Sequence, residues 1–269
     1  MNYPLVCDKS KAFHLEINGK SAGRDFLLIA GPCSVESEAQ ITECARIAHE
    51  AGADILRGGV FKPRESPYSF QGLGFEGLKM LHGAAKMYQL PIVSEVVDTR
   101  DVEKMAQYCD ILQIGARNMQ NYALLTEAAK SQRIILLKRG MNATIEEFLG
   151  AAEYIALAGN EKIILCERGI ACRDSQTRNC LDLASVPVLK SLTHLPVFVD
   201  PSHATGRRDL IEPMSLAAVM CGADGLEIEV HPEPDKALSD AAQQLGEEAF
   251  RRISKKIRAC VSFRDQNLI

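Results

Sequence analysis

Residues 133–166 read RIILLKRGMNATIEEFLGAAEYIALAGNEKIILC and combine two different hydrophobic patterns. The runs at 133–138 and 162–166 are short and almost continuously apolar, which is typical of strands buried on both faces. The segment between them, 144–159, has the apolar spacing of an amphipathic helix and ends in glycine, a common helix stop. A strand, a helix and a second strand in this order predict a βα unit of a parallel sheet.

The same alternation continues on both sides of this segment. Further strand-like runs lie at 26–30, 53–57, 91–95, 110–114, 195–200 and 224–229. Eight βα units in 269 residues favour a (β/α)8 TIM barrel, with a doubly wound open sheet as the alternative. The stretch FHLEINGKSAG predicts a short β-hairpin that turns at Asn18-Gly19. We therefore expect an N-terminal extension over 1–25 and one catalytic barrel over 26–269.

Composition limits the classes of partner. The chain has 31 basic and 35 acidic residues, so no strong overall field would attract it to nucleic acid or to a membrane. Its apolar runs are too short to span a bilayer, and the first residues lack the pattern of a signal peptide. Nine cysteines without CxxC spacing are typical of reduced thiols. We expect a cytoplasmic protein without nucleic-acid or membrane partners.

Basic residues recur where the predicted strands end. Functional groups of a barrel gather at the carboxyl ends of its strands. The cations at or after these ends are Arg57, Lys62, Arg64, Arg117, Lys138 and Arg168. Each alone would be expected to be a solvated surface charge. Together at one mouth they predict a site for a small, strongly anionic substrate, because arginine grips two oxygens at once and lysine supplies a point charge.

A second group of residues has the chemistry of metal ligands. Cys33, His203, Glu229 and Asp240 follow the first, seventh and eighth predicted strands. A thiolate, an imidazole and two carboxylates suit a divalent transition metal with a position left open for substrate. The alternative for Cys33 is a packed apolar side chain. His203 has polar neighbours in DPSHATGRR, which favours a functional role over a core position.

Several long motifs resemble one known family. They are LIAGPCSVES, LRGGVFKPR followed by SPYSFQGLG, DILQIGARNMQN, LLKRGMNATIEEF, ILCERG, VDPSHATGRRDL and GADGLEIEVHPEPDKALSD. This set is similar to 3-deoxy-D-arabino-heptulosonate 7-phosphate (DAHP) synthase, in the short microbial branch related to 3-deoxy-D-manno-octulosonate 8-phosphate synthase. The resemblance implies a TIM barrel that condenses phosphoenolpyruvate with D-erythrose 4-phosphate and water, releasing phosphate. This reaction is the first step of the shikimate pathway.

The resemblance also implies a role for each motif residue. The metal ligands fall on Cys33, His203, Glu229 and Asp240, and the metal would be manganese, iron, cobalt or zinc. Phosphoenolpyruvate would be held by Arg57, Lys62, Arg117, Lys138 and Arg168, and the aldehyde by Pro63, Arg64, Glu65 and Ser66. Lys62 would donate a proton to the aldehyde oxygen, and Asp200 would lie near the reacting carbonyl and the metal. The family also implies a homodimer or homotetramer, and the chain length leads us to expect no added regulatory domain.

Glu65 departs from the family pattern, which has threonine at this position. A carboxylate cannot donate a hydrogen bond when ionised, and it repels a phosphate dianion. Glu65 either turns outward or pairs with a nearby arginine, so that erythrose 4-phosphate still binds, or it selects a different aldehyde. Three further alternatives are an octulosonate phosphate synthase, a Schiff-base aldolase that uses Lys138, and a barrel that binds ligand without catalysis. The loop that contains Glu65 has the sequence KPRESPYSF, which disfavours an octulosonate phosphate synthase.

Overall fold

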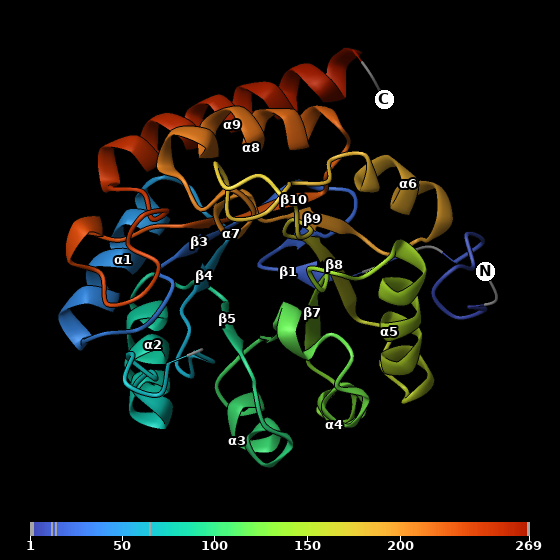
Figure 1. Cartoon of the computed structure of the whole chain (residues 1–269), viewed down its shortest axis with the longest axis horizontal. Coiled ribbons are helices and arrows are strands. Elements are labelled where there is room, and N and C mark those ends of the chain that lie inside the picture. Colours follow the sequence, from blue (N-terminus) through green and yellow to red (C-terminus); the bar gives the residue numbers. More distant parts are fainter. Residues whose placement is uncertain (1–2, 12, 14, 65, 268–269) are drawn as a thin grey trace.

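The computed structural model describes residues 3–11, 13, 15–64 and 66–267, and strands β3 to β10 form a closed barrel (Figure 1). The barrel order is β10-β3-β4-β5-β6-β7-β8-β9, with neighbours in parallel register. The strands are β3 (Leu27–Gly31), β4 (Ile55–Arg57), β5 (Ile92–Glu95), β6 (Ile111–Ile114), β7 (Ile134–Lys138), β8 (Ile163–Glu167), β9 (Val197–Val199) and β10 (Gly225–Glu229). The (β/α)8 prediction is confirmed, and the open-sheet alternative is wrong.

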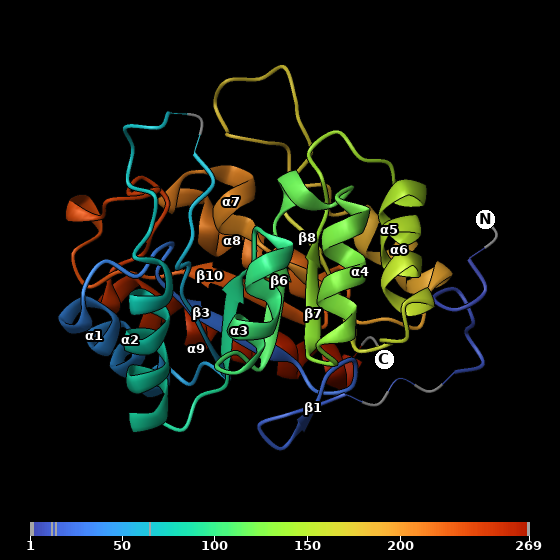
Figure 2. The same cartoon turned by 90° about the horizontal axis from the view of Figure 1, so that it is seen from below.

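Helices surround this barrel and form its outer layer (Figures 1 and 2). They are α1 (Glu38–Glu50), α2 (Gly74–Met87), α3 (Val102–Ala106), α4 (Tyr122–Lys130), α5 (Ile145–Leu157), α6 (Ser185–Leu192), α7 (Pro201–Thr205), α8 (Arg208–Met220) and α9 (Glu247–Asn267). The 3-10 turns in the described part of the chain are η1 (Thr99–Asp101), η2 (Ala116–Asn118) and η3 (Pro234–Lys236), which lie in the connections. None of the helices in the described ranges is both long and apolar enough to cross a bilayer.

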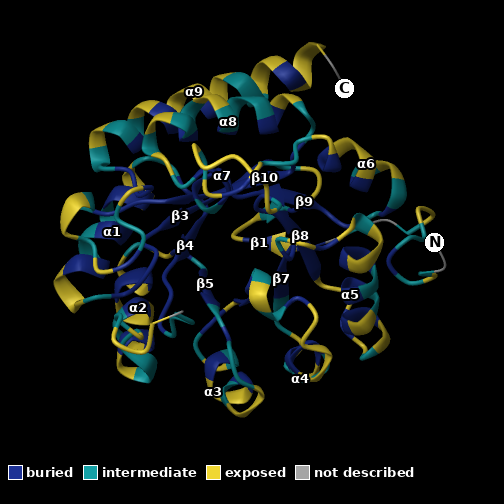
Figure 3. Cartoon of the chain, in the orientation of Figure 1, coloured by how far each residue is buried: buried dark blue, intermediate teal, exposed yellow. Residues whose placement is uncertain are grey.

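The hydrophobic core has two layers, which the strands separate. Along β3, Leu27 and Ile29 point into the barrel, whereas Leu28 and Ala30 pack against the helices. This alternation follows from the two-residue period of a strand. Both faces of the strands are therefore buried, while the helices turn their exposed residues outward (Figure 3). The near-continuous hydrophobicity of the strand sequences reflects this double burial.

The predicted hairpin is present and covers the amino-terminal end of the barrel. Strands β1 (Glu16–Ile17) and β2 (Lys20–Ser21) pair in antiparallel fashion. Asn18 and Gly19 between them have positive φ angles of 52° and 76°, as a tight hairpin turn requires. Ile17 packs with barrel-interior residues such as Leu27 and Phe198. The division of the chain at residue 25 stays a prediction.

Two long connections project from the opposite, carboxyl end. They follow β4 and β8 and rise above the barrel on the same side (Figure 2). The first carries Lys62, Arg64 and Ser66, and the second runs from Arg168 toward α6. These loops border the opening in which the predicted site residues meet.

Candidate active site

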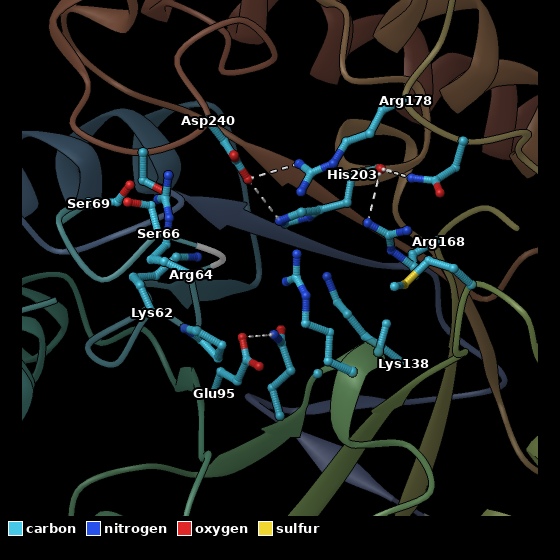
Figure 4. Close-up of a pocket in the computed structure, with 18 residues that line it drawn as sticks. Lys62, Arg64, Ser66, Ser69, Glu95, Lys138, Arg168, Arg178, His203 and Asp240 are labelled. Carbon is cyan, nitrogen blue, oxygen red and sulfur yellow. Dashed lines mark hydrogen bonds and ion pairs between the residues drawn. The ribbon is translucent and has the colours of Figure 1, made fainter. Parts of the chain in front are cut away.

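A cavity of about 510 Å³ lies at the carboxyl ends of the barrel strands (Figure 4). Its lining residues are Lys62, Pro63, Arg64, Ser66, Ser69, Glu95, Gln113, Gly115, Ala116, Arg117, Lys138, Met141, Arg168, Arg178, Asn179, His203, Ser239 and Asp240. Cys33, Asp200 and Glu229 are buried and contact members of this lining. Arg57 is also buried and contacts Glu229. The structure therefore brings together all predicted site residues except Glu65, which lies outside the described residues.

Helix α7 sets the position of His203. Asp200 directly follows β9 and caps α7, because its carboxylate accepts the backbone N–H of His203 at 2.9 Å. Pro201 occupies the first helical turn, and Gly206 ends the helix in the left-handed region with φ of 68°. The second carboxylate oxygen of Asp200 lies 2.6 Å from Nδ1 of His203. This bond orients the imidazole and leaves Nε2 to face the metal-ligand residues.

Cys33, His203, Glu229 and Asp240 form a compact cluster. One ligand atom from each lies within 4.8 Å of all the others. His203 Nε2 is 3.2 Å from Glu229 Oε1 and 3.7 Å from Asp240 Oδ2, and Cys33 Sγ is 3.4 Å from the same Asp240 oxygen. Glu229 Oε1 is buried and accepts no hydrogen bond from the described residues. A thiolate, an imidazole and two carboxylates at this spacing fit a divalent transition metal.

The charge states of the cluster depend on its burial. Burial, with Glu229 nearby, raises the pKa of the Cys33 thiol to about 12, so a metal has to displace its proton. Burial alone would raise the pKa of Asp200, but His203 and Lys138 outweigh it and hold that pKa well below its usual range. Burial would likewise raise the pKa of Asp240, but His203 and Arg178 lower it. The carboxylates are therefore ionised and ready to bind a cation.

Buried cations form the other half of the site. Arg57 lies 2.7 Å from Glu227 and 3.2 Å from Glu229, and Lys138 is paired with Asp200 and with Glu227. Nε of Arg57 and Nη1 of Arg168 are buried and donate no hydrogen bond to a described residue. Such unpaired donors are costly unless a ligand satisfies them. An anion in the cavity would do so.

The loop after β4 connects the metal-ligand cluster with the cationic part of the site. Lys62 donates to the sulfur of Cys33 at 3.1 Å and to its carbonyl at 3.2 Å. Arg64 donates to the hydroxyl of Ser239 at 2.8 Å, and that hydroxyl is 3.2 Å from the Cys33 sulfur. Pro63 and Ser66 line the cavity beside them. The predicted aldehyde loop therefore lies in direct contact with the predicted metal ligands.

Comparison with known proteins assigns this geometry to a family. The DAHP synthetase I family matches residues 12–262. The chain belongs to this family. The family is metal-dependent, and the cluster of four ligands is a suitable metal site for it. Which metal it binds stays a prediction.

Individual members of the DAHP synthetase I family and related enzymes show how close the match is. Phospho-2-dehydro-3-deoxyheptonate aldolase of Thermotoga maritima is 53% identical over 233 residues, covering 87% of this chain and 69% of the relative. A crystal structure of that T. maritima enzyme superimposes with a TM-score of 0.94 at 47% identity, over 98% of this chain and 78% of the other. A truncated form of 3-deoxy-D-arabino-heptulosonate 7-phosphate synthase from the same organism superimposes with a TM-score of 0.90 at 44% identity. The match covers 98% of this chain and 97% of the other.

The octulosonate branch is more distant from this member of the DAHP synthetase I family. A 2-dehydro-3-deoxyphosphooctonate aldolase of Syntrophotalea carbinolica is 34% identical over 250 residues, covering 86% of this chain and 89% of the relative. The sequence of the loop after β4 disfavoured an octulosonate phosphate synthase. The higher identity to the heptonate aldolase than to the octonate aldolase agrees with that prediction.

Sequence reasoning missed several residues of the site in this family member. Glu227 is fully buried and pairs with both Arg57 and Lys138. The two-residue period of GLEIE puts Glu227 on the same strand face as Glu229, so the sequence could have predicted Glu227 as a site residue. Arg178 and Ser239 touch metal-ligand residues from irregular loops, where no sequence period marks them. Glu95 and Gln113 line the cavity from the ends of β5 and β6.

Proposed function

We propose that this chain condenses phosphoenolpyruvate with D-erythrose 4-phosphate and water at the cavity, giving DAHP and phosphate, the first step of the shikimate pathway. The observation that carries the proposal is the match of the DAHP synthetase I family to residues 12–262. The juxtaposition of a metal-ligand cluster and buried cations in one cavity supports it. We further propose a cytoplasmic homodimer or homotetramer.

Binding is the main task of the cations. Lys138 and Arg168 line the cavity, and Arg57 is buried beside Glu229. The unpaired donors of Arg57 and Arg168 would bind the phosphate and carboxylate of phosphoenolpyruvate. Arg117 lines the cavity from η2 beside them. Arg64 and Ser66, on the loop after β4, would bind the aldehyde's phosphate. The carboxylates around Arg57 and Lys138 hold these side chains in place and preserve their charge.

The reaction then proceeds by carbon–carbon bond formation. The C3 atom of phosphoenolpyruvate attacks the aldehyde carbon, and the aldehyde oxygen takes a proton, for which Lys62 is the donor we propose. Water adds to the cationic C2 atom and loses a proton, and the bond from C2 to the phosphate oxygen breaks to give the ketone and phosphate. A metal on Cys33, His203, Glu229 and Asp240 would polarise the aldehyde oxygen or orient the acceptor. Asp200 keeps Nε2 of His203 directed at that position.

The decisive experiment measures phosphate release from phosphoenolpyruvate with added Mn²⁺. Erythrose 4-phosphate is compared with arabinose 5-phosphate and with aldehydes that lack a phosphate, before and after EDTA. We expect release with erythrose 4-phosphate, loss of release in EDTA, and recovery when metal is restored. Release with arabinose 5-phosphate alone would instead identify an octulosonate phosphate synthase. Borohydride trapping of substrate on Lys138, with no effect of EDTA, would identify the Schiff-base alternative.

A further inference from the structure

Arg178 is a cavity residue in a more open environment than the buried cations Arg57 and Lys138. Its Nη1 atom donates to Oδ2 of Asp240 at 3.1 Å and to Oε1 of Gln243 at 3.3 Å. Its side chain is 35% exposed, whereas those of Arg57 and Lys138 are 4% exposed. Arg178 therefore contacts a metal-ligand residue through a side chain that is partly open to solvent, and Figure 4 shows this contact with Asp240.

The fold builds this contact through the backbone. The N–H of Arg178 donates to Thr205 at 2.9 Å, and the next N–H donates to Ala204 at 2.8 Å, both on the helix that carries His203. Gly206 adopts φ of 68°, and a Cβ atom there would lie only 2.8 Å from Cβ of Arg178. The loop after β8 is thus fixed on α7 at Arg178 and its neighbour, so the contact with Asp240 is not a chance pairing of mobile surface chains.

Asp200, Glu229 and Asp240 each have a cationic partner. Asp200 pairs with Lys138 and His203, and Glu229 lies 3.2 Å from Arg57. Of the lysines and arginines that the structure describes, Arg178 is the one within ion-pair distance of Asp240. The oxygen it binds, Oδ2, is also the oxygen nearest Cys33 and His203. A metal held by these ligands would need the same oxygen.

We propose that Arg178 is an exchangeable counter-cation of the metal site. While the cluster is empty, the guanidinium neutralises Asp240. A divalent metal replaces it at Oδ2, and the partly exposed side chain moves toward solvent. The positive charge of Arg178 therefore weakens metal binding through competition and like-charge repulsion, and it stabilises the metal-free protein. The inference rests on the metal site of the proposed function and is independent of which aldehyde the enzyme uses.

The test compares Arg178→Gln and Arg178→Lys with the parent protein, all stripped with EDTA. Binding of Co²⁺ is measured by calorimetry against a competing chelator, and thermal melting is recorded with and without the metal. We expect Arg178→Gln to bind Co²⁺ about tenfold more tightly, because a like charge is removed from beside the ion. Its metal-free form should melt at a lower temperature than the parent, and Arg178→Lys should be intermediate in both measurements.

Arg252→Gln is the matched control. It removes the same charge from α9, where Arg252 pairs with Glu212, and it should change neither Co²⁺ affinity nor the stabilisation that metal provides. Weaker Co²⁺ binding by Arg178→Gln would overturn the proposal, since Arg178 would then position Asp240 for the metal. Unchanged affinity would overturn it as well. A parent protein that binds Co²⁺ but releases no phosphate would contradict the proposed function and leave this inference standing.

Discussion

At the residue scale, Lys138 has two functions that an experiment can separate. It is buried between Asp200 and Glu227, and we propose that it also binds phosphoenolpyruvate. Lys138→Met leaves two buried carboxylates without this cation. Removal of one partner from a buried ion pair costs about 3–5 kcal/mol, so we expect the free energy of unfolding to fall by that amount and phosphate release to be lost. Urea unfolding and the phosphate assay measure the two effects.

A double variant distinguishes the structural effect from the catalytic one. In Lys138→Met/Glu227→Gln the second carboxylate no longer carries a charge, so part of the lost stability should return. Activity should stay absent, because the substrate still lacks its cation. Glu227 also pairs with Arg57, so a double variant no more stable than Lys138→Met alone would show that the loss of this second pair offsets the gain.

Glu65 supplies the second prediction at this scale. Its neighbour Arg64 is bonded to Ser239, close to Cys33, so the loop directs a cation at the position expected for the aldehyde's phosphate. A carboxylate next to this cation weakens its attraction for a dianion. Glu65→Thr restores the family residue, and we expect the KM for erythrose 4-phosphate to fall by about fivefold.

The KM for phosphoenolpyruvate is the internal control for Glu65→Thr, and it should not change. Steady-state kinetics with each substrate varied in turn gives both constants. A rise in the KM for erythrose 4-phosphate would show that Glu65 helps to bind this acceptor, and the expected repulsion between the Glu65 carboxylate and the phosphate would be wrong.

At the element scale, the amino-terminal cap of α5 can be tested. The Thr144 hydroxyl accepts the N–H of Glu147 at 3.1 Å, and the Glu147 carboxylate accepts the N–H of Thr144 at 2.8 Å, which makes a complete capping box. Thr144→Ala removes half of it and should lower the free energy of unfolding by about 1 kcal/mol. Urea unfolding measures the loss. Because the cap is exposed and outside the cavity, kcat/KM should stay at the parent value, and a large fall would contradict this account.

The elements that the sequence predicted well are those with a regular hydrophobic period. Runs such as 133–138 and 162–166 correspond to β7 and β8, because a strand buried on both faces has an almost continuously apolar sequence. The hairpin at Asn18-Gly19 was predictable because its turn requires positive φ angles. The predicted cations and metal ligands converge because parallel strands all end at one face of the barrel.

Arg178 and Ser239 lie in loops, whose sequences have no regular hydrophobic pattern. Arg178 reaches Asp240 because its loop pairs with α7, and this pairing is a long-range contact of irregular backbone. Ser239 meets Cys33 and Arg64 across a similarly irregular connection. Only the closed fold places these loops side by side. The sequence motifs therefore predicted the site residues at strand ends but did not predict Arg178 and Ser239, the loop residues that complete the site.

At the scale of the whole molecule, the metal site and the fold should be separable. The two core layers consist of apolar side chains inside the barrel and between strands and helices, and the four metal-ligand residues occupy only its carboxyl end. Asp200, Glu229 and Asp240 already have cationic partners within the protein. Metal removal thus leaves no unpaired carboxylate in the cluster, and the barrel does not need the ion to fold.

We therefore expect EDTA to abolish phosphate release while the far-ultraviolet circular dichroism spectrum stays unchanged. The stripped protein should still unfold in one cooperative transition, at a midpoint temperature below that of the metal-loaded protein, because a ligand that binds only the folded state adds to its stability. Adding Mn²⁺ back should restore both activity and midpoint. Loss of the folded spectrum in EDTA would show instead that the ion pairs around the cluster do not compensate for the missing metal, and that the carboxyl end of the barrel depends on the ion for its structure.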